Sequence, residues 1–209
     1  MLKIWGRMSS INVKKVVWAA QELGLDFERA DTGGAFGLTQ TPEALQRNPN
    51  ALVPVLDDDG FVLWESNVMV RYLCKKHSPG DWYPSGLQDL FNAERWMDWQ
   101  QTTFNPAGRT AFWHVIRLPA EQRDMAAVAK SVAATGPLLD LLEQHLSASP
   151  FIAGARITMA DIPLACEIHR WWGLPQAITQ RPTYPHIERW YAGMQARPAS
   201  RGVLDLPLS

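Results

Sequence analysis

Val53-Pro54-Val55-Leu56 is an apolar, β-branched run interrupted by a proline. Because proline cannot donate to a sheet ladder, this run predicts an edge strand or a special turn. A cis peptide bond has a low energetic cost only before proline. A cis Val53–Pro54 bond would turn the N–H and C=O of Val53 away from the sheet. The backbone edge freed in this way could pair with another extended peptide, and because a binding site of that kind requires the cis bond, we predict one at this position.

Trp64-Glu65-Ser66-Asn67 follows shortly afterwards and places an acid and a hydroxyl at the start of a predicted helix. Ser66 is a favourable N-cap residue, and the free N–H groups and dipole of a helix N-terminus attract a carboxylate. Glu65 can accept an ammonium group. Together with the proline run, this stretch predicts a receptor for a small extended peptide that carries a free amino-acid head.

The segments around these residues resemble the glutathione-binding core of cytosolic glutathione transferases. The similarity lies in residues 48–56, 63–66 and 70–73, and residues 157–163 resemble the capping box of the family's helical domain. The motifs follow the family's order and spacing over nearly the whole chain. Bacterial theta-like members, which begin with Trp-Gly-Arg as residues 5–7 do here, are the nearest match. The resemblance implies a thioredoxin-like α/β N-terminal domain followed by an all-α C-terminal domain.

Composition narrows the class of protein. Of the 209 residues, 46% are hydrophobic, and 20 basic residues balance 21 acidic ones. The lack of a basic block argues against a nucleic-acid partner. No apolar run approaches the ~20 residues that span a bilayer, and residues 1–5 do not resemble a signal peptide, which predicts a cytoplasmic location. Cys74 and Cys166 have no metal-ligand spacing, so we expect no metal site and two buried structural thiols.

The hydrophobic pattern of the first third alternates between strand and helix periods. The order strand, helix, strand, helix, hairpin, helix is typical of a thioredoxin-like layer. Gly24 is expected to end the first helix, and a glycine-rich loop at 33–37 is expected to be mobile. The predicted elements are strands at 2–5 and 27–30, helices at 13–23, from Thr41 and at 66–76, and a hairpin of 53–56 and 62–63 around 57–60.

Residues 77–86 contain two prolines and two glycines and are predicted to be a linker. This divides the chain into domains at 1–79 and 86–209. Pro106 is expected to end or kink the first helix of the second domain. Thr158 and Asp161 form a predicted capping box with a structural role. The predicted helices of this domain are 87–105, 121–147, 158–172 and 184–196.

The N-terminus of the first helix is the predicted catalytic position. The resemblance implies attack by the glutathione thiolate on an electrophile, and an ordinary thiol has a pKa of about 8.5. The protein must therefore stabilise the anion. By resemblance Ser10 occupies the position of the family's activating serine, while the amide of Asn12 can donate to the same sulfur, and Ser9 ranks behind both. The alternative is that all three residues only cap the helix.

Residue types missing from this turn narrow the chemistry further. No cysteine is present, which argues against omega-like and beta-like members, and no tyrosine is present, which argues against the alpha, mu and pi types. Leu52 stands where many theta-like members have a lysine that helps to bind the glycyl carboxylate. Gln40 or Arg7 is expected to replace that lysine.

The electrophile pocket is expected between the domains, facing Ser10. Its candidate lining residues are Phe36 from the first domain and Phe104, Arg109, Phe112 and Trp113 from the second. Helix-core packing is the alternative for these aromatic residues. An arginine at position 109 would suit an acidic electrophile such as a haloacid.

We therefore predict a glutathione transferase that catalyses substitution of a halide or conjugate addition. It would use glutathione as co-substrate, bind no permanent cofactor, and have neither nucleic-acid nor membrane partners, and the resemblance implies a homodimer. The alternatives are a glutathione-dependent peroxidase or reductase, and a non-catalytic binding protein that retains the fold. The residues predicted to bind glutathione are Val53, Pro54, Glu65 and Ser66, and those predicted to activate its thiol are Ser10 and Asn12.

Overall fold

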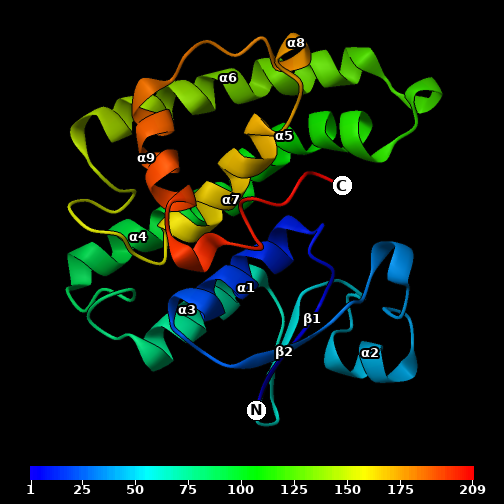
Figure 1. Ribbon diagram of the computed structural model, residues 1–209, viewed down its shortest axis with the longest axis vertical. Helices are drawn as coiled ribbons and strands as arrows, with labels where there is room; N and C mark the ends of the chain where they lie inside the picture. Colours follow the sequence, from blue (N-terminus) through cyan, green and yellow to red (C-terminus); the bar gives the residue numbers. More distant parts are fainter.

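The computed structural model describes residues 1–209 and combines a four-stranded sheet with a larger helical part (Figure 1). The strand order is β2-β1-β3-β4. β1 (Leu2–Trp5) pairs in parallel with β2 (Phe27–Ala30) and antiparallel with β3 (Val55–Asp58). β3 in turn pairs antiparallel with β4 (Phe61–Leu63). This mixed sheet, with its helices, confirms the predicted thioredoxin-like layer.

Three helices belong to the sheet layer. α1 (Ile11–Glu22) and α3 (Ser66–His77) pack against each other, whereas α2 (Pro42–Arg47) lies on the other side of the strands (Figure 1). The side chain of Thr41 accepts a hydrogen bond from the Ala44 N–H at 3.2 Å and caps α2, as the sequence predicts. Gly24, with φ 63°, follows the end of α1 and confirms the predicted helix stop.

The second part of the chain is helical, which confirms the predicted all-α character. It contains α4 (Leu87–Trp99), α5 (Asn105–Phe112), α6 (Met125–Ala148), α7 (Asp161–Trp172), α8 (Gln176–Thr179) and α9 (Pro185–Gln195). Short 3-10 or π-helical segments are η1 (Gly34–Phe36), η2 (Gln100–Phe104), η3 (Trp113–Arg117), η4 (Ala120–Gln122) and η5 (Pro198–Ser200). The glycine-rich loop predicted at 33–37 contains η1, and α8 was not predicted.

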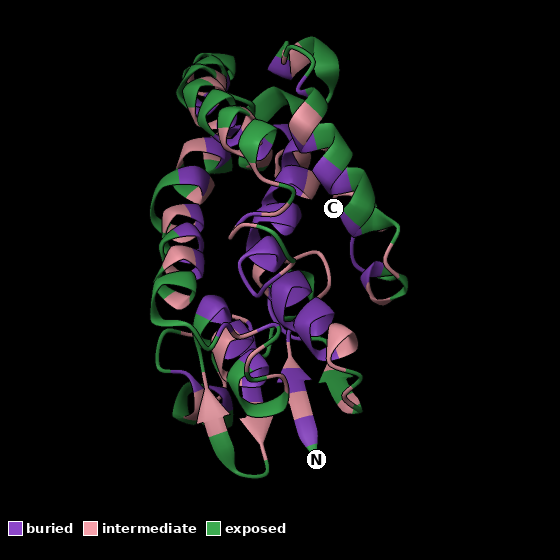
Figure 2. Ribbon diagram, turned by 90° about the vertical axis from the view of Figure 1, so that its left-hand side faces the viewer, coloured by how far each residue is buried: buried purple, intermediate pink, exposed green.

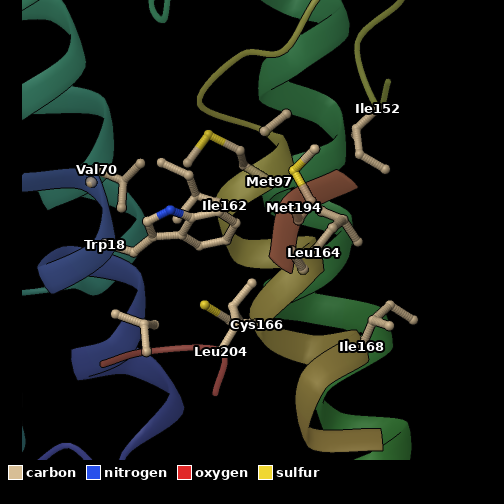
Figure 3. Packing of buried hydrophobic residues seen from close by; sticks show 14 of the residues in the cluster. Trp18, Val70, Met97, Ile152, Ile162, Leu164, Cys166, Ile168, Met194 and Leu204 are labelled. Carbon is tan, nitrogen blue, oxygen red and sulfur yellow. The ribbon is translucent and has the colours of Figure 1, made fainter. Parts of the chain in front are cut away.

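One hydrophobic core joins the two parts. α1 packs against α7, and 41 buried residues form a single cluster that includes side chains from both. Figure 2 shows the buried residues along the centre of the molecule. In Figure 3 the indole of Trp18, which is fully buried, extends from α1 towards Ile162 of α7. α1 is therefore held between the sheet layer and the helical part.

The first strand of the predicted hairpin is shifted by two residues in the structure, and the second starts one residue earlier than predicted. β3 starts at Val55 and continues through Asp58, so the turn consists of Asp59 and Gly60 alone. Both residues have positive φ, 52° and 94°, as two-residue hairpin turns require. Three consecutive aspartates suggested a longer turn, but the sheet register places two of them within the strand.

The predicted helix at 87–105 does not end near Pro106. α4 runs into η2, which is π-helical, then into α5 and η3, and the helix ends only at Arg117. Pro106 therefore lies within a continuous run of helical residues, where it has no N–H to donate to a carbonyl of the preceding turn. The wide π-helical turn of η2 directly before Pro106 accommodates the missing hydrogen bond. Such π-helical segments are frequent at functional sites.

α7 starts at Asp161 rather than at Thr158. The Asp161 carboxylate accepts a hydrogen bond from the Thr158 N–H at 2.8 Å, so half of the predicted capping box is present. The Thr158 hydroxyl accepts instead from the Ala160 N–H at 3.3 Å. Residues 158–160 therefore form a turn before the helix.

α6 is long and apolar enough to cross a membrane by length and composition alone, with a mean hydropathy of 1.3. Lys130, Asp140 and Glu143 interrupt α6, so it is not a continuous apolar run of the kind on which the sequence prediction rests. α6 packs along α5 and α9, and core helices of this size pass the same test. The feature is accordingly weak evidence for a membrane span.

Candidate functional site

A cleft of about 560 Å³ lies where the sheet layer meets the helical part. One side is formed by the turn before α1, the loop between α2 and β3, and the start of α3. The other side is formed by η2, α5, η3 and the end of α7. The lining is predominantly polar, with six hydrophobic residues among 23. The cleft thus brings together the segments that the sequence singles out.

Ser10 and Asn12 both line this cleft at the N-terminus of α1. Ser10 occupies the N-cap position, with φ −89° and ψ 123°, but its side chain makes no capping hydrogen bond. The Oδ1 atom of Asn12 is buried and has no hydrogen-bond partner. Capping alone therefore does not account for these residues, and both side chains are available to a ligand.

Ser9 connects the same turn to the helical part. Its carbonyl accepts a hydrogen bond from Nη2 of Arg117 at 2.8 Å. Burial and the neighbouring charge of Arg7 both lower the pKa of the Arg117 guanidinium. The turn is thus braced by a cation at the site where the sequence predicts a thiolate.

Val53 and Pro54 line the cleft, and the peptide bond between them is cis, as predicted. Sheet pairing of β3 begins only at Val55. The N–H and C=O of Val53 make no hydrogen bond within the protein. The buried side chain of Asn48 fixes the preceding loop, because its Nδ2 donates to the Leu52 carbonyl at 2.9 Å. A free backbone edge is therefore held in place at the cleft.

Glu65 and Ser66 line the cleft at the start of α3, but their roles at the helix end differ from the prediction. Glu65, not Ser66, is the N-cap residue, because its carbonyl accepts the first helical bond from the Met69 N–H at 3.0 Å. Glu65 has φ 74°, a strained conformation for a residue other than glycine, and such strain is concentrated at functional sites. Ser66 is the first helical residue, 3% exposed.

Only some of the residues predicted to form the electrophile wall line the cleft. Arg109 and Trp113 line the cleft together with Phe112. Phe36 does not line the cleft: it lies on η1 and is 53% exposed. Phe104 is 1% exposed and packs against Trp99 with ring centroids 5.1 Å apart, so it belongs to the core. The turn of η2 rotates this residue away from the cleft.

Four arginines line the cleft, and Glu65 provides the only carboxylate among the lining residues. Arg170 forms an ion pair with Glu167, which leaves three arginines with no carboxylate partner. These are Arg7, Arg109 and Arg117. Sequence reasoning did not place Arg117 in the site, because the helix that carries it was predicted to end at residue 105. The only available signal was the spacing of Arg109 and Arg117, about two turns on a continuous helix.

The remaining predictions concern residues around the cleft. Arg7 lines it and Gln40 does not, so Arg7 is the better placed of the two candidates to replace the lysine missing at Leu52. Asn50, which was not predicted, also lines it. Cys74 and Cys166 are fully buried, and burial raises the pKa of each thiol to about 12, which confirms that they are structural.

Comparison with known proteins places this geometry in a family. Residues 1–75 match the family model of the glutathione S-transferase N-terminal domain, and residues 125–193 match that of the C-terminal domain. The chain is 36% identical to glutathione S-transferase GstB of Escherichia coli, over 100% of both proteins.

Solved structures agree with this assignment. The theta class glutathione S-transferase of Xanthomonas axonopodis pv. citri with glutathione bound is 39% identical, with a TM-score of 0.95 over 100% of this chain and 99% of that chain. Its apo form matches with a TM-score of 0.85 at 35% identity, over 100% and 98% of the two chains. The chain therefore belongs to the glutathione S-transferase family, and its fold is similar to that of the bacterial theta class.

Proposed function

We propose that the chain is a glutathione transferase that activates the glutathione thiol and directs it at a small anionic electrophile. The observation that carries the proposal is the free backbone edge of Val53. It lies in one cleft with the start of α3 and with the hydroxyl of Ser10, which makes no capping hydrogen bond. A backbone N–H and C=O at a fixed edge recognise an extended peptide by strand-like pairing.

The amino-acid head of glutathione suits the start of α3. Ser66 and the free N–H groups of the first turn provide donors for the α-carboxylate of the γ-glutamyl residue, and the helix dipole favours a negative charge there. Glu65 provides an acceptor for the ammonium group. The thiol of the central cysteine then lies towards the N-terminus of α1, where Ser10 and Asn12 are available as donors.

The chemistry follows from this arrangement. The thiol releases its proton to solvent, and donors at the α1 N-terminus stabilise the thiolate. The sulfur attacks the electrophilic carbon, a C–S bond forms, and the carbon–halogen bond breaks with the halide leaving with its electron pair. Conjugate addition uses the same thiolate, with a proton from solvent in place of a departing halide.

Replacing Ser66 with alanine tests the binding mode. A hydrogen bond to a charged group contributes about 1.5–3 kcal/mol, so we expect glutathione affinity to fall by roughly ten- to a hundredfold. Isothermal titration calorimetry measures this directly. Ser85→Ala, an exposed serine between α3 and α4, is the control and should bind as the wild type does. Unchanged affinity in Ser66→Ala would contradict the proposed site.

The excess of arginine at the electrophile wall supports an anionic substrate. Arg109 makes no ion pair or side-chain hydrogen bond within the protein and stands beside Phe112 and Trp113. A carboxylate on the electrophile can pair with its guanidinium, and such charge-assisted bonds orient a substrate as well as binding it. The aromatic side chains provide the apolar contact surface.

Comparing a haloacetate with the matching haloacetamide tests this substrate class, because the two differ mainly in charge. Arg109→Met should lower kcat/KM for the haloacetate about tenfold and leave that for the haloacetamide nearly unchanged. Arg95→Met, on the exposed face of α4, is the control and should change neither. An equal loss of kcat/KM with both substrates would show that Arg109 does not distinguish the charged substrate from the neutral one.

We further propose a homodimer in the cytoplasm without a permanently bound cofactor. Support for the dimer comes from exposed apolar side chains on neighbouring elements, namely Phe61 of β4, Val68 of α3 and Phe91 of α4. Arg71 of α3 forms ion pairs with two carboxylates of α4 and so joins α3 to α4. The domain boundaries 1–79 and 86–209 also remain a prediction.

A further inference from the structure

A buried cation lies directly behind the cleft. Lys15 of α1 is fully buried, and its Nζ donates to Oε1 of Gln100 at 2.9 Å and to Oε1 of Gln101 at 3.1 Å. No carboxylate lies within salt-bridge distance of it. Buried charges are usually paired, so an ammonium group held by two amides is an expensive arrangement. Burial lowers the pKa of Lys15 to about 8.

The two glutamines that hold this cation have different surroundings. Gln100 is fully buried, donates from Nε2 to Glu167 at 2.7 Å and accepts from Asn67 at 3.4 Å. Its carbonyl oxygen thus accepts two hydrogen bonds and its NH2 group donates one within the protein. Gln101 is only half-buried and lines the cleft, and its Nε2 has no partner in the protein.

Chemistry fixes the direction of the Gln101 amide. A lysine ammonium can only donate, so the atom of Gln101 that faces it must be the carbonyl oxygen. The NH2 group is thereby left for the cleft. A second cation would be repelled from the carbonyl by Lys15, so Gln101 is a donor to an anion and not an acceptor for an ammonium group.

The position of this donor identifies the anion. Asn67 follows Ser66 at the start of α3 and is joined to Gln100 by a hydrogen bond, so Gln101 is linked to the helix end that takes the amino-acid head. We propose that Lys15 is a positioning residue, which locks the Gln101 amide so that its Nε2 donates to the α-carboxylate of the γ-glutamyl residue. This inference rests on the proposed glutathione site.

Gln101→Met removes the donor and keeps the length and neutrality of the side chain. We expect the KM for glutathione to rise about tenfold or more, with kcat at saturating glutathione little changed, because the contact is made equally in the ground state and the transition state. An analogue with 4-aminobutyryl in place of the γ-glutamyl residue keeps the ammonium group and lacks the α-carboxylate. Its KM should be the same in the wild type and in Gln101→Met.

Gln101→Glu tests the link to Lys15 without changing the lysine. If Lys15 holds the oxygen of residue 101, a carboxylate there pairs with the buried ammonium, so Tm should rise while glutathione affinity falls. Tm and affinity falling together, or Tm unchanged, would overturn the role of Lys15. An equal change of KM for glutathione and for the analogue in Gln101→Met would overturn the role of Gln101.

Lys15→Met provides the direct comparison. This variant should raise the KM for glutathione and leave the KM for the 4-aminobutyryl analogue unchanged. The double variant Lys15→Met/Gln101→Met should bind glutathione as well as either single variant does, because both substitutions act on one contact. Additive losses would contradict the proposal. Since the wild type is measured throughout, absence of glutathione binding in the wild type would identify failure of the proposed function itself.

Discussion

Replacing Ser10 with alanine should raise the pKa of the thiol of bound glutathione by about one to two units. Its hydroxyl makes no capping hydrogen bond and lies at the N-terminus of α1, so it is free to donate the proposed O–H···S⁻ hydrogen bond. Each unit corresponds to about 1.4 kcal/mol of lost anion stabilisation. Turnover at neutral pH should fall by about ten- to a hundredfold, with a smaller change in glutathione affinity, because the bond favours the reacting anion.

Two neighbouring variants separate the possible donors. Ser9→Ala removes a hydroxyl that lines the same cleft, and we expect it to leave the thiol pKa unchanged. Asn12→Ala should shift it less than Ser10→Ala does. A shift with Asn12→Ala and none with Ser10→Ala would reverse our ranking. No shift with either would leave the backbone N–H groups of α1 as the activating group.

Replacing Asp161 with alanine should destabilise the fold by about 3 kcal/mol or more. This fully buried carboxylate accepts hydrogen bonds from the Ile152 N–H at 3.1 Å, the Thr158 N–H at 2.8 Å and Nε1 of Trp190 at 2.9 Å. Burial raises its pKa to about 6, so it is still ionised at pH 7. Alanine leaves three buried donors unsatisfied, at about 1–3 kcal/mol each.

Thermal or urea unfolding measures this effect, and for a chain of this size Tm should fall by roughly 6 °C or more. Asp124→Ala is a matched control, since Asp124 also accepts at a helix start, from the Ala126 and Ala127 N–H groups, but is exposed. Asp124→Ala should lower the free energy of unfolding by about 1 kcal/mol, as the loss of an ordinary N-cap does. Equal losses from the two variants would show that burial of Asp161 does not govern its contribution.

Local signals in the sequence predicted most of the sheet layer, but not the bounds of the hairpin or the N-cap residue of α3. Alternating apolar patterns, the cap at Thr41, the stop at Gly24 and the proline at position 54 each act over a few residues, and each feature appears in the structure. The residues proposed to bind glutathione belong to these same segments. The family resemblance, rather than any local signal, predicted that Ser10, Asn12, Val53 and Ser66 share one site, and all four line the cleft.

The helical wall could not be predicted in the same way. Its shape depends on η2, a wide turn that lets the helix continue past Pro106 and turns Phe104 into the core. No local signal distinguishes such a turn from a helix end. Arg117 and Arg170 come from separate helices, so only tertiary packing brings them to the cleft.

The pH titration of thiolate absorbance in the wild-type complex with glutathione tests the central claim most directly. The cleft is proposed to bind glutathione and to stabilise its anion, so the bound thiol should titrate at least about one unit below the ordinary thiol pKa of about 8.5. Free glutathione under the same conditions gives the reference curve. A bound thiol that titrates at the same pH as free glutathione would contradict the account.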